Sequence, residues 1–371
     1  MSEVFGLVMA GGGGTRLWPL SRLDRPKQVL HLLGTRSLFQ MALDRLQPWL
    51  SLERILVAAP PDLMPALRSQ APDLPEASFL VEPSPKGTAA VIGLAALRLS
   101  QSHPDALMVC LTADHHIGNA ERLRHLLLAA CDVAETGALV TLGIPPTYAD
   151  IGYGYIEQGD SMGLFREFEA HRVRAFKEKP DRAVAEAYLK DGDHSWNSGM
   201  FVWRVDRILD AIERFMPNLA TALGRIRPSL GSADEARVLA QEWNQIHRQT
   251  IDVGVMERAD NVAVLAATDL MWADIGSWDR LYELRHPDAE GNVLDASVSL
   301  AVDSRGTLVV SREREQGGRP KLVALLGVED LVIVDTGDVL LVCPRQRAPQ
   351  VRELVERLQA SGLDTYMVWE S

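Results

Sequence analysis

The chain has 371 residues, of which 47% are hydrophobic and 24% are charged, and its formal net charge is −12. These values lie near the averages of globular proteins and exclude a disordered or fibrous chain. The acidic balance and the lack of a basic run argue against a nucleic-acid-binding protein. A polyanion such as a nucleotide would have to be held locally, by positioned basic groups, backbone amides and a divalent metal.

Targeting signals and cysteines also narrow the class of protein. No stretch approaches the roughly 18 apolar residues that a membrane span needs, and the beginning of the chain lacks the basic region of a secretory signal. Cys110, Cys131 and Cys343 are too few and too scattered for a disulfide framework or a zinc cluster. We therefore expect a protein of the reducing cytoplasm that does not act at a membrane.

The first 285 residues alternate between short apolar runs and helical patterns. The runs predict strands, and the intervening patterns predict helices over Thr88–Gln101, Glu121–Glu135 and Arg182–Lys190, the last with Asp181 as its N-cap. The expected strands are Val4–Met9, Arg54–Ala58, Ser78–Val81, Ala106–Leu111, Ala138–Leu142, Val173–Lys177 and Gly199–Trp203. This alternation predicts an α/β domain over residues 1–285, with a mostly parallel, Rossmann-like sheet flanked by helices.

The remaining residues, 286–371, have a different pattern. Short β-rich segments punctuated by Gly, Asp and Pro predict strands at Val298–Asp303, Thr307–Ser311, Lys321–Gly327, Leu331–Asp335 and Val339–Cys343. A helix is expected at Ala348–Gln359, and Gly362 lies just beyond it as a stop signal. We predict a small second domain of stacked β-turns followed by a helix.

A glycine-rich loop follows the first predicted strand. It comprises Ala10, Gly11, Gly12, Gly13, Gly14 and Thr15, and its glycines allow the backbone to approach a ligand closely. A glycine run alone would indicate a flexible turn between a strand and a helix. This run lacks the Gly-Lys-Ser/Thr ending of a Walker P-loop and the glycine spacing of a Rossmann dinucleotide-binding motif. Because Arg16, Arg22, Arg25 and Lys27 follow within a dozen residues, we interpret the loop as a phosphate cradle.

Seven motifs in one order make the chain resemble the sugar-1-phosphate nucleotidylyltransferases, and its LWPLSR form resembles the mannose-1-phosphate guanylyltransferases. The motifs are GGGGTRLWPLSR with RPKQ (residues 11–28), ADH (113–115), GYGYI (152–156), FKEKP (176–180), WNSGMF (196–201), ID with VME (251–257) and WADIGSW (272–278). The resemblance implies a fold of the nucleotide-diphospho-sugar transferase type with a short left-handed β-helix at its end. It also implies transfer of GMP from GTP to mannose 1-phosphate, which gives GDP-mannose and pyrophosphate.

The chemistry of such a transfer explains the residue types in these motifs. The sugar phosphate is already an anion at neutral pH, so it needs no strong general base. The rate enhancement must therefore come from positioning the two substrates and neutralising their charge. The resemblance implies that Arg16 contacts the leaving pyrophosphate and that Lys27 lies near the α-phosphate. The alternative for an isolated Arg or Lys is solvated surface charge. Arg22 and Arg25 could instead form salt bridges with Asp24.

Two aspartates are candidate ligands of Mg²⁺. Asp114 follows the predicted strand 106–111, and Asp274 follows the apolar run 270–273. Carboxylates at the ends of strands can line a ligand crevice and hold Mg²⁺ together with nucleotide phosphates. Either aspartate alone could equally cap a turn. Because Mg²⁺ prefers oxygen ligands, we expect His115 and His116 to be structural.

The resemblance also implies a site for the sugar phosphate. Glu178 would accept hydrogen bonds from sugar hydroxyls, Lys179 would pair with the phosphate, and Asn197 and the backbone at Gly152 would complete the site. Alternatively, Glu178 and Lys179 are charged residues at the end of a strand, and Gly152 is a turn residue. The tryptophans of these motifs are expected in the core or in a pocket wall.

Glu82 is the candidate base selector. Guanine presents a ring N–H beside an amine, and one carboxylate can accept both. Uracil and thymine present one N–H between carbonyls, which suits an amide better, so Glu82 favours guanine; its alternative is a carboxylate at a helix start. Gly87 and Thr88 are expected to contact the nucleotide, as is Asp114. Lys86-Gly87 departs from the Arg-Asn of the resembling family, and Lys does not replace a forked Arg.

Two alternatives to this function stay open on the sequence alone, and the oligomeric state is expected only by analogy. Another sugar 1-phosphate, such as that of glucose or a heptose, could be the acceptor, because sugar choice depends on hydroxyl geometry. The chain could also be a catalytically silent sugar-nucleotide sensor, although such a sensor has no need of both Mg²⁺ carboxylates. A homodimer formed through the β-rich tail is expected by analogy.

Overall fold

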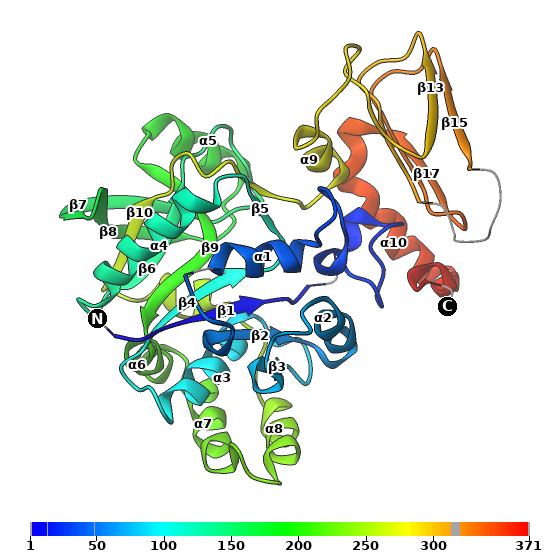
Figure 1. Cartoon of the computed structure of the whole chain (residues 1–371). Coiled ribbons are helices and arrows are strands. Elements are labelled where there is room, and N and C mark those ends of the chain that lie inside the picture. Colours follow the sequence, from blue (N-terminus) through cyan, green and yellow to red (C-terminus); the bar gives the residue numbers. More distant parts are fainter. Residues whose placement is uncertain (1, 13, 48, 313–319, 370–371) are drawn as a thin grey trace. The chain divides into compact units, whose positions relative to one another are not determined.

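The computed structural model describes residues 2–12, 14–47, 49–312 and 320–369, and the chain divides into two compact units (Figure 1). The sheet unit comprises Met1–Gly11, Ala42–Ala113 and Ile117–Trp272. The tail unit comprises Gly12–Met41, Asp114–His116 and Ala273–Ser371. The glycine-rich loop and the ADH motif therefore each contain a point where the chain passes from one unit to the other.

A nine-stranded mixed sheet forms the centre of the sheet unit, in the order β3-β2-β1-β4-β9-β6-β10-β8-β7. Its strands are β1 (Val4–Met9), β2 (Ile55–Ala59), β3 (Phe79–Val81), β4 (Leu107–Thr112), β6 (Leu139–Ile144), β7 (Tyr155–Phe165), β8 (Phe168–Lys177), β9 (His194–Arg204) and β10 (Val262–Ala266). Only β8 and β9 run against the other seven, as the pairings show. The predicted mostly parallel sheet is confirmed.

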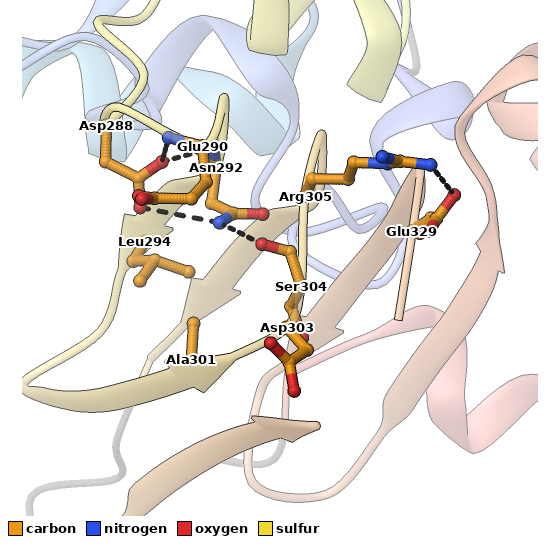
Figure 2. A pocket seen from close by; sticks show the side chains of 9 residues that line it. All are labelled: Asp288, Glu290, Asn292, Leu294, Ala301, Asp303, Ser304, Arg305 and Glu329. Carbon is orange, nitrogen blue, oxygen red and sulfur yellow. Dashed lines mark hydrogen bonds and ion pairs between the residues drawn. The ribbon is translucent and has the colours of Figure 1, made fainter. Parts of the chain in front are cut away.

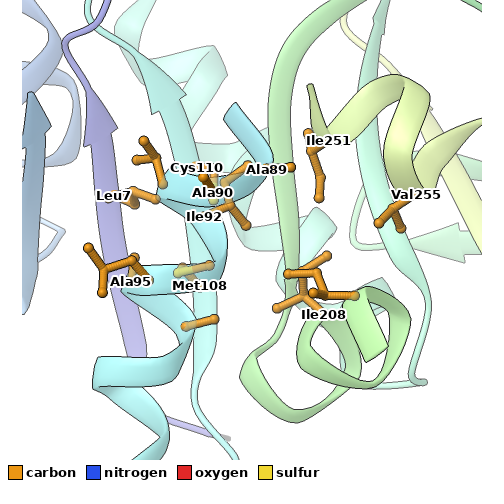
Figure 3. Packing of buried hydrophobic residues seen from close by; sticks show 14 of the residues in the cluster. Leu7, Ala89, Ala90, Ile92, Ala95, Met108, Cys110, Ile208, Ile251 and Val255 are labelled. Carbon is orange, nitrogen blue, oxygen red and sulfur yellow. The ribbon is translucent and has the colours of Figure 1, made fainter. Parts of the chain in front are cut away.

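Helices cover both faces of this sheet. Helix α4 (Ala120–Ala134) packs on β6 and β9, and α3 (Thr88–Ser100) packs on β1 and against α6 (Val205–Phe215). Figure 3 shows α3 residues Ala90 and Ile92 between Leu7 of β1 and Ile208 of α6. The other helices of the unit are α2 (Met64–Gln70), α5 (Arg182–Asp191), α7 (Pro217–Ile226) and α8 (Glu235–Trp243), and α1 (Leu38–Leu46) begins in the tail unit and ends in the sheet unit.

The tail unit is built from strands that alternate between two small sheets. One sheet has the order β12-β14-β16-β17 and the other pairs β13 with β15. The strands are β12 (Val293–Asp295), β13 (Val298–Val302), β14 (Leu308–Ser311), β15 (Leu322–Leu326), β16 (Leu331–Asp335) and β17 (Leu340–Pro344). Only the pairing of β16 with β17 is antiparallel. Because successive strands from β12 to β16 switch sheets and each sheet is parallel there, the backbone winds as a short solenoid.

The tail unit has its own hydrophobic core. Leu308 and Val310 of β14 pack with Trp278 of α9 (Trp278–Glu283) and with Val351 and Val355 of α10 (Val351–Ala360). Alternation along the strands produces this core, because every second residue of a strand points to the same side. Two short strands, β5 (His115–Ile117) and β11 (Trp272–Asp274), each contain a crossing point between the units.

The predicted elements agree with the structure to within three residues, except that β8 and β9 each begin five residues earlier than predicted. Asp181 caps α5 by accepting a hydrogen bond from Val184 N at 2.9 Å. The long strand β7 and helices α6–α8 were not predicted. No helix among the described residues is long and apolar enough to cross a membrane. The division of the chain at residue 286 stays a prediction.

Candidate functional site

The glycine-rich loop follows β1 and requires glycine in at least one place. Gly12 and Gly14 have φ values of 105° and 56°, which side chains with a Cβ rarely adopt. A Cβ on Gly14 would lie 2.7 Å from Ser21 Oγ and 3.1 Å from Lys27 N. Gln28 Nε2 donates to Gly12 O at 3.2 Å and so braces the loop. The loop backbone therefore lies directly against the Lys27 segment.

The other predicted loop residues differ in their surroundings. Ala10 is fully buried and its N–H donates to Ala58 O at 2.8 Å, which continues the β1–β2 ladder. Gly11 is exposed, and Thr15 begins the short 3-10 helix Thr15–Leu17. Gly13 lies outside the described residues.

Lys27 joins the two predicted metal ligands within the tail unit. Its Nζ lies 2.9 Å from Asp114 Oδ2, 3.3 Å from Asp274 Oδ1 and 3.4 Å from Ile275 O. The lysine is buried, with 7% of its surface exposed, whereas each aspartate side chain is 22% exposed. Burial would lower the pKa of Lys27, but attraction to Asp114 and Asp274 outweighs it and raises the pKa. A charged ammonium therefore lies between the two carboxylates.

The carboxylates fit a divalent metal in number and type. Mg²⁺ in nucleotide-binding proteins takes one or two carboxylates, with phosphates and water completing its octahedron. Asp114 and Asp274 come from segments 160 residues apart in sequence, and both reach the same point, the Nζ of Lys27. Among the described residues, no group of three or more His, Cys, Asp or Glu side chains is arranged to hold a metal. Phosphate oxygens would have to complete the coordination.

Arg16 lies on the tail unit with its guanidinium against the backbone of Gly276. A Cβ on Gly276 would lie 3.0 Å from Arg16 Nη2, so a larger residue would displace the guanidinium. Arg16 is exposed, and its charge lowers the pKa of Lys27 to a small extent. Two basic groups are thus held close together next to the glycine-rich loop.

Arg22 and Arg25 do not belong to this group. The side chain of Arg22 is fully buried and forms a bidentate ion pair with Asp338 at 2.7 and 2.8 Å. Arg25 lies over the ring of Trp369, 5.4 Å from its centroid. The expected alternative partner, Asp24, accepts instead from Trp369 N. Both arginines hold the C-terminal segment.

Glu82 follows β3 and closes a tight loop in the sheet unit. Its Oε1 accepts a hydrogen bond from Lys86 N at 2.8 Å, and only 7% of the residue is exposed. Burial raises the pKa of Glu82, while the Lys86 hydrogen bond and the charge of Arg248 act against that shift. The carboxylate is held in place by the loop that it closes.

The same loop is braced by residues 243–251. Gly87 has a φ of 87°, and its Cβ would collide with the backbone of Gln249. Thr88 Oγ1 accepts from Ile251 N at 2.9 Å, and Trp243 Nε1 donates to Ser84 O at 2.8 Å. Glycine at position 87 thus allows close packing of two backbones, and the Thr88 hydroxyl is used structurally.

A polar cluster in the sheet unit contains three predicted residues of the sugar-phosphate site, together with Asp252. The three are Glu178, Lys179 and Asn197. Asn197 Nδ2 donates to Asp252 Oδ1 at 2.7 Å, and Asn197 Oδ1 accepts from Gly199 N at 3.1 Å. Glu178 pairs with Lys179. Burial and the charge of Glu178 raise the pKa of Asp252 to about 6. These contacts fix the amide of Asn197 in one orientation.

The sequence reasoning missed two members of this region. Asp252 and Glu257 both lie in the motif over residues 251–257, to which no role was given; Glu257 Oε1 accepts from Glu178 N at 2.9 Å. Gly154 lies against the Glu178 carboxylate, where a Cβ would collide. Gly152 instead donates its N–H to Asp150 Oδ1 at 2.7 Å. The motif over residues 251–257 was the signal in the sequence that could have identified Asp252 and Glu257.

Aromatic rings line the segments next to this cluster. Tyr153 lies 5.1 Å from Trp196 and 5.3 Å from Trp272 between ring centroids, and Tyr148 lies 4.9 Å from Trp196. Trp196 is buried and Trp272 is partly buried. The expectation that these tryptophans form a wall or core agrees with this packing.

A separate hollow of about 610 Å³ lies in the tail unit (Figure 2). None of the predicted site residues lines it. Asp288 accepts from Glu290 N and Asn292 N, and Arg305 pairs with Glu329 at 2.8 Å. Asp288 and Glu329 thus stabilise the turns between coils.

Comparisons with known proteins agree with this arrangement. The Nucleotidyl transferase family profile matches residues 5–291, and the profile of the MannoseP isomerase/GMP-like beta-helix domain matches residues 298–358. These matches and the fold define a nucleotidyl transferase with a β-helix domain. Enzymes of this class generally use a divalent metal.

Individual relatives cover nearly the whole chain. The mannose-1-phosphate guanylyltransferase ManC of Salmonella typhimurium is 36% identical over 97% of this chain and 74% of its own length. The xanthan biosynthesis protein XanB of Xanthomonas campestris is 35% identical over 98% of this chain and 74% of its own length. A solved structure from Thermus thermophilus, described as a mannose-1-phosphate geranyltransferase, is 34% identical, with a TM-score of 0.84 over 96% of this chain and 99% of its own. The chain belongs to the family of mannose-1-phosphate guanylyltransferases.

The raised pKa of Asp252 predicts a pH-dependent stability. The folded state keeps this proton up to about pH 6, whereas an unfolded chain releases it near pH 4. The folded state binds more protons in this window, so stability falls as the pH rises through it. In Asp252→Asn this loss disappears, and we expect the stability of the variant relative to wild type to rise by about 2–3 kcal/mol between pH 4 and pH 7.

Denaturant unfolding measured at several pH values tests this expectation. The exposed Asp260, whose side chain is 77% accessible, supplies a matched control. The free energy of unfolding of Asp260→Asn should change with pH as that of wild type does. If the free energy of unfolding had the same pH dependence in wild type and in Asp252→Asn, the raised pKa of Asp252 would be contradicted.

Proposed function

We propose that the chain transfers GMP from GTP to mannose 1-phosphate, with in-line attack of a sugar phosphate oxygen on the α-phosphorus. The O–P bond to the nucleotide forms as the bond to the β-phosphate breaks, so GDP-mannose and pyrophosphate are the products. The observation that carries the proposal is the group of Lys27, Asp114 and Asp274, because basic and acidic side chains converge there next to a glycine-rich loop. The names of the relatives support the choice of substrates.

The residues of the chain act by positioning and by neutralising charge. In our proposal, Arg16 binds the pyrophosphate that leaves, and Lys27 binds at the α-phosphate. Losing one such contact to the transition state typically costs about 10²–10³-fold in rate. Glu178 and Asn197 orient the sugar, with Asn197 fixed by Asp252, and Lys179 binds the phosphate of the acceptor. No general base is required, because the nucleophile is already ionised.

Asp114 and Asp274 are the proposed ligands of Mg²⁺. When bound, the cation would neutralise phosphate charge as a Lewis acid. The support for magnesium is the ligand type, since hard oxygen donors suit Mg²⁺ better than softer metals. His115 remains structural in this scheme, with its Nε2 3.9 Å from Asp114 Oδ1.

Pyrophosphate release is the direct test of the reaction. The protein is incubated with Mg²⁺ and one of the pairs GTP plus mannose 1-phosphate, GTP plus glucose 1-phosphate or UTP plus mannose 1-phosphate. We expect strong release only with the first pair. Release with another pair would keep the enzyme class and overturn the substrates, and no release with any pair would support a silent sugar-nucleotide sensor.

Replacing Glu82 by glutamine should reduce the preference for GTP. A glutamine side chain can accept only one of guanine's two adjacent N–H groups, and its own amide would face the other donor. We expect the ratio of kcat/KM for GTP to that for UTP to fall by about 10- to 100-fold. The exposed Glu76 offers a control, and Glu76→Gln should leave the ratio unchanged. An unchanged ratio in Glu82→Gln would refute the base assignment.

We also propose that the chain forms a homodimer through the outer face of β13 and β15. Val298, Leu300 and Val302 on β13 and Leu322 and Leu326 on β15 are 43–75% exposed, and the parallel register places them on one face. Such a patch is unusual on a monomer. Because none of these side chains is charged, the face can pack against its own copy without like-charge repulsion.

Light scattering after size exclusion measures the association. We expect wild type at twice the chain mass of 40.9 kDa, and Leu300→Glu at the mass of one chain. Leu354, which is 43% exposed on α10, provides the control, and Leu354→Glu should leave the mass unchanged. A monomeric wild type would exclude the dimer.

A further inference from the structure

We propose that Lys27 is an internal counterion that occupies the metal position between Asp114 and Asp274, and that it must leave the carboxylate pair before a divalent cation binds there. The starting observation is that the Nζ of Lys27 contacts one oxygen of each aspartate, at 2.9 and 3.3 Å. The proposal rests on the proposed function for the metal position at Asp114 and Asp274 and for the identity of the phosphates that later receive the lysine.

Electrostatics explains why an ammonium lies there. Two carboxylates that converge on one point repel each other, and a buried ammonium without a partner is costly. Together the three side chains carry a net charge of −1 and satisfy one another. The pair of aspartates is therefore kept converged even without a cation.

The same contact excludes a divalent cation. Mg²⁺ lies about 2.1 Å from its oxygen ligands, so a cation shared by these two oxygens would lie next to Nζ, and the two positive charges would repel strongly in a partly dry site. Arg16 adds further positive charge nearby. The cation can enter only when the lysine side chain moves away.

The structure also provides for that movement. The backbone of Lys27 lies in the 3-10 helix Lys27–Val29, all of whose residues are buried, whereas the four-carbon stem of a lysine has rotatable bonds. The stem begins beside the glycine-rich loop, where a Cβ on Gly14 would lie 3.1 Å from Lys27 Cβ. Phosphates held by that loop would lie within reach of the ammonium. We therefore infer that the cation enters together with phosphate.

Binding of Mn²⁺ to the metal-free full-length protein tests the proposal without substrates. Electron paramagnetic resonance of unbound Mn²⁺ gives the dissociation constant. We expect wild type to bind Mn²⁺ weakly and Lys27→Met to bind it at least about tenfold more tightly. Because Met could perturb folding, Lys27→Gln is measured in parallel, and far-UV circular dichroism checks both variants.

Two further variants locate the effect. Lys321→Met removes a lysine of the same unit that pairs with Asp335 at 2.6 Å, so it changes the net charge equally and should bind like wild type. The double variant Lys27→Met/Asp274→Asn should lose the gain. The proposal is overturned if wild type already binds as tightly as Lys27→Met, if Lys321→Met gains equally, or if the double variant keeps the gain.

A final arm separates this inference from the proposed reaction. Adding a non-hydrolysable GTP analogue to wild type should tighten Mn²⁺ binding beyond its affinity for the analogue alone. If Lys27→Met gains affinity but the analogue has no effect, the counterion role stands and the proposed nucleotide is wrong. If pyrophosphate is released but Lys27→Met gains nothing, the reaction stands and the counterion role falls.

Discussion

Replacing Asp274 by asparagine should lower kcat/KM for pyrophosphate release about 10³-fold and raise the Mg²⁺ concentration needed for half-maximal rate. The amide keeps the size of the side chain but removes the negative charge that attracts a cation, and it weakens the contact that Asp274 Oδ1 makes with Lys27 Nζ at 3.3 Å. Losing one charged ligand typically costs at least as much as losing one preorganised donor. Steady-state assays over a range of Mg²⁺ concentrations give both quantities.

A neighbouring carboxylate provides the matched control. Asp279 lies five residues further along in the same unit, on α9, and is held near Arg345 at 3.9 Å. Asp279→Asn makes the same chemical change and should keep kcat/KM within a few-fold of wild type. A loss smaller than tenfold in Asp274→Asn, or an equal loss in Asp279→Asn, would show that Asp274 does not hold the metal.

Replacing Arg22 by methionine should destabilise the protein by about 3–5 kcal/mol. The guanidinium of Arg22 is fully buried and donates to both carboxylate oxygens of Asp338 and to the carbonyls of Pro19 and Val368 at 2.7–2.9 Å. Methionine fills much of the volume but donates no hydrogen bond, so these acceptors lose the guanidinium, while Asp338 keeps the hydrogen bond from Thr336 Oγ1 at 3.0 Å. Guanidinium chloride unfolding measures the change.

Arg25 separates this effect from the general loss of a positive charge. It is exposed and lies over the same Trp369 ring as Arg22, at 5.4 Å compared with 4.4 Å. Arg25→Met should change the free energy of unfolding by less than about 0.5–1 kcal/mol. Equal effects of the two substitutions would contradict the role given to the buried ion pair.

The elements with strong local signals could be predicted from the sequence. The apolar run Val4–Met9 is β1 residue for residue, and helix α3 begins at Thr88 as expected. Both signals are local, because burial of a parallel strand and helical periodicity each leave a pattern in consecutive residues. The hairpin strand β7 was missed because none of its residues from Glu157 to Phe165 is buried, so burial leaves no run of apolar residues there.

For the candidate site, the sequence indicates which residue types are present and in which motifs they lie. The motifs of the family that the chain resembles contain all of the main candidates: Arg16, Lys27, Asp114, Asp274, Glu178 and Asn197. Their assigned roles stay predictions. Spacing along the chain indicated the family, since seven motifs in register rarely occur by chance.

The contacts of each charged group depend on the fold and not on the local sequence. Arg22 and Lys27 are five residues apart and look alike in the sequence, yet Arg22 pairs with Asp338 and Lys27 with Asp114 and Asp274. The partners are 87 to 316 residues away in sequence, and no local pattern records such a distance. An ion pair forms where the folded backbone brings opposite charges within about 4 Å in a place with little water, and chain connectivity over hundreds of residues determines that place.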